Sequence, residues 1–270
     1  MKTILIKGII IVLFGIIAIA VQAQELSEDA LKKANNPLAE MTALNFQNYY
    51  IPSFSEAPAQ SYANNFWIRY AQPFANGKLL LRASVPLVTT SFGFDTIGIP
   101  KSNSGLGDAN MFLSYNFVSS ANKTIGIGPL IAAPTASQTE LGSGKWQAGL
   151  AFVAFIANSP KFQFGSLITW QISVGGDEDR ANTNMSAVQP FLFWQLGGGT
   201  YLRSAPIWVF DFEKEQFYVP FSLGIGKVVK VNNTIFNLFI EPQYSILHQG
   251  TQPQFQIFAG INLQFIKSKN

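Results

Sequence analysis

The stretch DANMFLSYNF, from Asp108 to Phe117, alternates between apolar and mostly polar residues. Every second position is apolar, and the positions between are polar except for Phe112. Because a β-strand sends successive side chains to opposite faces, this stretch predicts a strand with one apolar and one polar face. The same alternation recurs in segments of about ten residues, the length of a tilted strand that crosses a bilayer. The pattern therefore indicates a transmembrane β-barrel whose apolar face contacts lipid.

The composition agrees with a membrane barrel. Only 12% of the residues are charged, whereas about 25% is usual for a soluble domain. The chain has no cysteine, which excludes disulfides, thiolate metal sites and a lipid anchor on an N-terminal cysteine.

Residues 1–23 have the features of a secretory signal peptide. Lys2 and Lys7 supply the positive charge, Ile9–Ala20 is an apolar run, and Val21-Gln22-Ala23 resembles a cleavage site. The alternative is an N-terminal membrane anchor, but the apolar run is short for a spanning helix. We therefore expect a mature chain that begins at Gln24.

Removal of the signal peptide changes the charge balance. Without Lys2 and Lys7, the 18 basic residues become 16, against 15 acidic ones. A nearly neutral chain with no cluster of lysine or arginine does not offer the basic surface that nucleic-acid binding requires. We expect no nucleic-acid partner.

The fold class predicted is all-β, a transmembrane antiparallel up-and-down barrel of about 12 strands, with 10 or 14 as alternatives, since bacterial barrels have even strand numbers. The barrel occupies residues 46–265. Residues 24–45 form an N-terminal periplasmic or plug segment that contains the only helical-looking stretch, and residues 266–270 form a short tail. The expected strands are Phe46–Phe54, Asn65–Phe74, Lys78–Val88, Asp108–Val118, Thr124–Ala133, Trp146–Phe155, Lys161–Ser173, Ser186–Leu196, Thr200–Phe210, Phe217–Gly226, Thr234–Ile246 and Phe255–Phe265.

Prolines lie inside several of these strands. Proline cannot donate to a sheet ladder, so we expect bulges or strand ends there. The positions are Pro86, Pro129, Pro190, Pro206, Pro220 and Pro242.

Short and long connections alternate through the middle of the chain. The long ones are Thr89–Gly107, Pro134–Lys145 and Val174–Met185. Outer-membrane barrels have short periplasmic turns and longer extracellular loops. The alternation predicts an outer-membrane location with both termini in the periplasm and outer-membrane lipid around the barrel.

The charged residues within the predicted strands fall on the polar face of those strands. A charge that faces lipid at the bilayer midplane costs about 2–4 kcal/mol, so these side chains are expected to face the lumen. Two alternatives stay open: they line a polar pore, or they pair across a filled interior. The candidate lumen-lining residues are Arg69, Arg82, Asp108, Asn110, Arg203 and Glu241.

One arc of the inward phase is apolar instead. It either binds a hydrophobic cargo, receives the segment Leu31–Leu44 as a plug, or is ordinary barrel packing. The candidates for this apolar wall are Phe155, Leu167, Phe191, Phe193 and Ile207.

The sequence offers little for catalysis. His248 is the only histidine, and its spacing from Ser245 places the two on opposite faces of a continuous strand. Asp177-Glu178-Asp179 lacks the spaced ligands of a calcium loop. We expect no enzyme activity, no catalytic residues, no metal site and no cofactor.

Two groups of residues resemble a known family. Gly105-Leu106-Gly107-Asp108 with Tyr115, and Pro134-Thr135-Ala136-Ser137 followed by Leu141-Gly142-Ser143-Gly144-Lys145-Trp146, resemble motifs of the outer-membrane β-barrel transporters grouped as phenol-degradation meta-pathway proteins. Ala136 stands where that family usually has glycine. The resemblance implies uptake of small, often hydrophobic or aromatic compounds.

The end of the chain carries a second resemblance. Gly260–Phe265 is similar to the C-terminal signal that the outer-membrane assembly machinery reads, although Ile266–Asn270 follow the aromatic residue and Phe258 takes a position that is normally polar. That machinery is therefore an expected partner.

Taken together, the expected function is passive uptake of small compounds through an outer-membrane channel. The alternative is a non-conducting barrel with a structural or partner-binding role. An outer-membrane hydrolase is the least favoured hypothesis. The sequence does not identify the cargo or an open pore.

Overall fold

The computed structural model describes residues 34–35, 41–94, 100–120 and 122–266. The predicted signal peptide, most of the predicted N-terminal segment and nearly all of the predicted tail lie outside the described residues.

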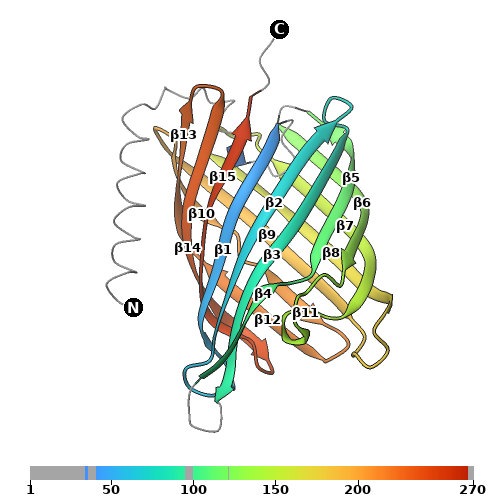
Figure 1. The fold of residues 1–270 in the computed structure, drawn as a ribbon. Coiled ribbons are helices and arrows are strands. Elements are labelled where there is room, and N and C mark those ends of the chain that lie inside the picture. The colour runs from blue at the N-terminus through green and yellow to red at the C-terminus, as the bar shows by residue number, and fades with distance from the viewer. Residues whose placement is uncertain (1–33, 36–40, 95–99, 121, 267–270) are drawn as a thin grey trace.

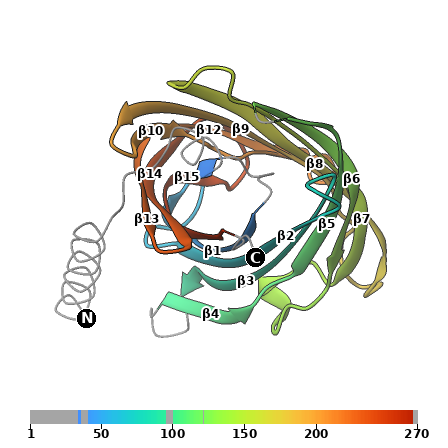
Figure 2. The ribbon, with the colours of Figure 1, turned by 90° about the horizontal axis from the view of Figure 1, so that it is seen from above.

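One antiparallel sheet contains all the strand segments and closes on itself, because the first segment pairs with the last (Figures 1 and 2). A single short 3-10 helix, η1 (Thr139–Leu141), interrupts a connection. The segments are β1 (Thr42–Phe54), β2 (Tyr62–Phe74), β3 (Leu79–Phe94), β4 (Pro100–Leu106), β5 (Ala109–Ser119), β6 (Lys123–Ala133), β7 (Lys145–Ile156), β8 (Phe162–Gly176), β9 (Asn184–Gly197), β10 (Thr200–Ser204), β11 (Trp208–Asp211), β12 (Gln216–Ser222), β13 (Gly224–Val231), β14 (Thr234–Gln249) and β15 (Pro253–Phe265).

These segments form a closed antiparallel barrel of 12 strands. Both β4 and β5 pair with β3, both β10 and β11 pair with β9, and both β12 and β13 pair with β14, so each couple is one interrupted strand. The predicted fold class is confirmed.

The longest predicted loop is largely strand. The region Thr89–Gly107 is one of the predicted long connections, but β3 continues to Phe94 and β4 returns beside it. Ser91 pairs with Ser102 and Thr89 with Ser104. Backbone pairing does not require apolar side chains, so polar residues extend this hairpin beyond the apolar part of the wall.

Two of the strand prolines mark irregularities, as expected. Pro206 lies in the break between β10 and β11, and a register shift separates Val219 from Pro220 in β12. Both positions lack a backbone donor, which is why the ladder is interrupted there.

The opening stretch shows how the two faces differ. Tyr115 has 56% of its surface exposed and Phe117 has 54%, whereas Ser114 has 0% and Asn116 has 4%. Phe112, the apolar exception on the polar phase, is also inside. The outer surface therefore carries large apolar side chains, and the inner surface carries the polar phase together with a few aromatic rings.

No helix among the described residues is long and apolar enough to cross a membrane.

We call the end where β1 begins and β15 finishes the short-turn end, because its connections are brief (Figure 1). The opposite end, which carries η1 and the β3–β4 hairpin, is the long-loop end.

Candidate functional site in the barrel lumen

The inward faces enclose a cavity of about 120 Å³. Asparagine and glutamine side chains make up much of its wall, together with three arginines, Arg69, Arg82 and Arg203. Liquid water occupies about 30 Å³ per molecule, so this space holds only a few waters or one small solute. The lumen is narrow at this level.

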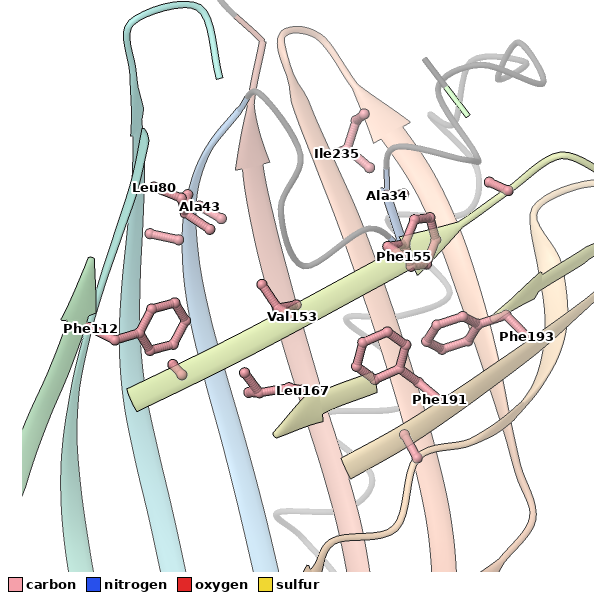
Figure 3. Close-up of a cluster of buried hydrophobic side chains, with 14 of the residues drawn as sticks. Ala34, Ala43, Leu80, Phe112, Val153, Phe155, Leu167, Phe191, Phe193 and Ile235 are labelled. Atoms are coloured by element: carbon pink, nitrogen blue, oxygen red, sulfur yellow. The ribbon is translucent and has the colours of Figure 1, made fainter. Parts of the chain in front are cut away.

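Toward the short-turn end an apolar cluster fills the barrel. Phe155, Phe191 and Phe193 are buried, with ring centroids 6.2 Å apart in each neighbouring pair; Phe155 is tilted against Phe191, and Phe191 stacks on Phe193. Leu167 joins the same cluster. Figure 3 shows these side chains pointing into the barrel, and Ala34 belongs to the same cluster.

Two residues from the predicted N-terminal segment, Ala34 and Asn35, lie inside the barrel and are buried. The Asn237 side chain donates from Nδ2 to the Ala34 carbonyl oxygen at 2.9 Å and to Asn35 Oδ1 at 3.0 Å. Gln264 Nε2 also donates to the Ala34 carbonyl, at 3.1 Å. The Tyr201 hydroxyl donates to Asn237 Oδ1 at 2.5 Å and so fixes the amide that holds the segment.

The charged candidates Arg203 and Glu241 form a buried ion pair. Arg203 Nε donates to Glu241 Oε2 at 2.5 Å. Glu241 Oε1 accepts from the backbone of Ala205 at 2.9 Å and from Gln243 Nε2 at 2.8 Å. The Arg203 guanidinium also lies over the Phe239 ring, 3.6 Å from its centroid. Both carboxylate oxygens of Glu241 accept hydrogen bonds. The negative charge of Glu241 balances the positive charge of Arg203.

The other two lumen arginines differ from Arg203. Arg69 donates from Nη1 to Gln47 Oε1 and lies over the Trp67 ring at 4.7 Å, but its buried Nε has no hydrogen-bond partner. Arg82 stacks over Phe112 at 5.2 Å, and its buried Nε is likewise unpartnered. Among the described residues, neither arginine has a carboxylate partner.

Asp108 does not border the cavity. Its carboxylate accepts hydrogen bonds from the backbone of Ala136 at 3.2 Å and of Ser143 at 2.7 Å, and from the Ser143 hydroxyl at 2.8 Å. Asp108 falls in the break between β4 and β5, where the strand no longer dictates that its side chain points into the lumen. Asp108 thus fixes the connection between β6 and β7, and a lumen-lining role for it stays a prediction.

The remaining two candidates lie inside but take separate positions. Asn110 faces inward opposite the buried Ser84, although it does not border the cavity. Ile207 packs with a second cluster, formed by Tyr49, Phe239 and Phe258, instead of with the other wall residues. The break between β10 and β11 separates Ile207 from the regular strand that would have carried it to the first cluster.

The face assignment of Ser245 and His248 changes in the structure. Ile246 and Leu247 are both exposed, and a register shift in the β12–β14 pairing falls there, so His248 returns to the same face as Ser245. The Ser245 hydroxyl nevertheless donates to the Pro253 carbonyl at 2.5 Å. Its proton is directed at a backbone oxygen and not at the imidazole, which is unlike a nucleophile paired with its base.

Within the described parts of the chain, no group of three or more histidine, aspartate or glutamate side chains could hold a metal ion.

Several lumen residues were not singled out from the sequence. Tyr201, Phe239 and Phe258 are aromatic residues on the polar phase, and they form the rings around the ion pair and the N-terminal segment. In the sequence, such a residue shows only as an apolar residue at a position where the alternation predicts a polar one, as at Phe258. Alternation alone does not tell an inward aromatic residue from an irregular strand.

Comparison with solved structures gives the same architecture. An outer-membrane channel from Pseudomonas putida F1 aligns with a TM-score of 0.62 and 13% identity, covering 83% of this chain and 94% of that chain. The NanC porin aligns with a TM-score of 0.52 and 11% identity, covering 83% of this chain and all of the other. At these identities the likeness shows the barrel fold alone. No protein-family model matches the sequence, and no similar sequence was found among curated proteins.

Proposed function

We propose that this chain is an outer-membrane channel for small solutes. The observation that carries the proposal is the inversion of polarity in a closed barrel, with exposed apolar side chains outside and arginines, a carboxylate and amides inside. An exterior of this kind is stable in lipid, and a polar interior is typical of barrels that admit water or solutes. The channel and porin with the same fold support this assignment.

The proposed orientation places both termini in the periplasm. It rests on the short connections at the end where β1 begins and β15 finishes, because periplasmic turns are short in such barrels. A cleaved signal peptide over residues 1–23 and a C-terminal assembly signal over Gly260–Phe265, read by the outer-membrane assembly machinery, belong to the same proposal.

The N-terminal segment is proposed to act as a plug. Ala34 and Asn35 lie in the lumen and are held by three side-chain hydrogen bonds from Asn237 and Gln264. A segment held by hydrogen bonds to a few amides can leave without unfolding the barrel.

Small hydrophobic or aromatic compounds are the proposed cargo. Phe191 and Phe193 of the apolar wall border the cavity beside Ala34 and Asn35, and offset stacking stabilises aromatic pairs by about 0.5–1.5 kcal/mol. The resemblance to phenol-degradation meta-pathway proteins points to the same class of compound.

The filled short-turn end also fits a barrel that does not conduct and serves a structural or partner-binding role. Planar-bilayer recordings of the purified protein separate the two functions. Conductance supports a channel. Its complete absence, together with absence of solute flux into liposomes, would support the structural barrel.

The plug is tested by Asn237→Ala, with Gln256→Ala as its control. Asn237 holds Ala34 and Asn35, whereas Gln256 is an equally buried amide that donates to Gln243 instead. We expect Asn237→Ala to raise the open probability and Gln256→Ala to leave it unchanged. Equal effects of the two variants would contradict a plug held at Asn237.

A further inference from the structure

Arg69 and Arg82 are neighbours on one inward face. In the β2–β3 pairing Arg69 is opposite Ser84 and Arg82 is opposite Ala71, so the two arginines occupy diagonal positions on the same side of the sheet. Diagonal positions lie about 7–8 Å apart at the backbone, within reach of long side chains. Both side chains border the lumen cavity.

The donors of these arginines are not satisfied within the described part of the protein. A guanidinium has five N–H donors. Arg69 donates from one nitrogen to Gln47 and interacts with the buried Tyr49 hydroxyl, while the Nε atoms of both arginines are buried without a hydrogen-bond partner. Stacking over Trp67 and Phe112 occupies the faces of the guanidinium groups but leaves their edges, which carry the N–H groups, free to donate. Burial of unpaired donors and charge is costly, so a ligand or water is needed at this point.

Within the described ranges, no acidic side chain pairs with Arg69 or Arg82. The one acidic side chain among the described residues that reaches this level of the lumen is Glu241, and Arg203 neutralises it at 2.5 Å. The other described acids lie at the long-loop end, and the Asp108 carboxylate is bonded to the β6–β7 connection there. Two positive charges therefore remain beside the cavity.

The neighbouring side chains fix the position of the pair. Gln47 donates through Nε2 to Asn262 Oδ1 at 2.9 Å, so its oxygen is turned toward Arg69. The ring of Phe112, which is 4% exposed, supports Arg82 from below. A cavity of about 120 Å³ in front of both arginines accepts a small ion with some water, whereas drug-sized ligands occupy about 300–1,000 Å³.

We infer that Arg69 and Arg82 form a binding site for a small monovalent anion, such as a halide, nitrate or short carboxylate, at the narrow part of the lumen. Guanidinium groups suit planar anions because two N–H groups can donate in parallel to two oxygens. If the lumen conducts, this site selects anions over cations, and that consequence rests on the proposed channel function. Binding itself does not depend on conduction.

The first experiment measures ion selectivity from the reversal potential of the full-length protein in a potassium chloride gradient. We expect chloride to permeate about threefold or more over potassium, because rings of charged side chains set pore selectivity. The double variant Arg69→Gln/Arg82→Gln should abolish the preference. Lys214→Gln, which removes an exposed lysine at the long-loop end, is the control and should keep it. A conducting channel without anion preference, or one whose preference survives the double variant, would overturn the inference and leave the proposed channel intact.

The second experiment uses the unaltered protein, so it does not require that the barrel conducts ions or that a variant folds. Crystals of the unaltered protein grown with sodium bromide should show an anomalous bromide peak between the two guanidinium groups. A peak there supports the site even if the barrel does not conduct, in which case only the channel proposal fails. Absence of bromide at the pair would show that the arginines are solvated by water alone and would end the inference.

Discussion

The two ends of the barrel are held together in different ways. At the long-loop end the β6–β7 connection is fixed by polar contacts, with Asp108 accepting from Ala136 and Ser143. At the short-turn end the lumen contains phenyl rings and Ala34, and a hydrogen bond from Asn237 holds Ala34 in place. A connection that lies in water cannot gain much from apolar burial, so hydrogen bonds to a fixed carboxylate replace it.

The described charged residues in and beside the connections differ between the ends as well. Those near the short turns are lysines, namely Lys78, Lys123, Lys161, Lys227 and Lys230. Most of those near the long loops are acidic, namely Glu56, Asp108, Glu140, Asp177, Glu178, Asp179, Asp211, Glu213 and Glu215. Between the two ends lie the three arginines and Glu241, so the described lumen carries a net positive charge at this level.

The largest expected effect comes from breaking the Arg203–Glu241 ion pair, which lies inside the barrel between its two ends. Glu241→Gln leaves Arg203 buried without its counter-charge, which should lower the free energy of unfolding by about 3–5 kcal/mol. Urea titration in lipid vesicles measures the change. The double variant Arg203→Met/Glu241→Leu removes both charges and should recover most of the loss. A single variant as stable as the unaltered protein would show that water reaches the pair.

A smaller loss should follow when the filling of the short-turn end is reduced. Phe155→Ala removes a ring that is 2% exposed and leaves a cavity next to Ala34, which should cost about 3–4 kcal/mol in the same titration. Phe117→Ala, on the outer face, creates no internal cavity and should cost clearly less. If the two variants were equally destabilised, the apolar cluster would not be what secures this end.

The smallest effect is expected at the long-loop end. Asp108→Asn replaces a carboxylate that accepts three hydrogen bonds, and should cost about 1.5–3 kcal/mol because hydrogen bonds to charged groups are the stronger ones. Limited proteolysis of the connection around Ser143 should become faster. Glu178→Gln, an exposed loop acid, is the control and should change neither quantity. Unchanged proteolysis in Asp108→Asn would contradict the clamp.

Much of the fold was predictable from local pattern. The alternation around Tyr115 predicted the two faces of its strand, and the same pattern repeated along the chain predicted the 12-strand barrel. The hairpin of β3 and β4 was not predicted, because its serines and threonines carry no apolar signal while their backbone still pairs. Prolines indicated irregular points such as Pro206, but not the direction in which the chain would turn there.

The lumen was predictable only in part. The inward direction of Arg69, Arg82, Arg203 and Glu241 follows from strand phase, which has a period of two residues. Which arginine meets the carboxylate does not follow, because Arg203 and Glu241 are 38 residues apart and meet only after the strands pair. The side-chain directions of Asp108 and His248 did not follow from strand alternation for a related reason. A strand break at Asp108 and a bulge beside His248 interrupt the alternation of inward and outward side chains.

The sequence by itself determined that this chain has one face suited to lipid and one suited to water, since that distinction depends only on alternation along each strand. Tertiary structure alone decided that Arg203 pairs with Glu241 while Arg69 and Arg82 have no carboxylate partner among the described residues, and that Ala34 reaches the lumen. Those facts depend on closure of the barrel, which brings β2, β3, β10, β14 and β15 around one narrow space and sets the distances between charges that lie far apart in the chain.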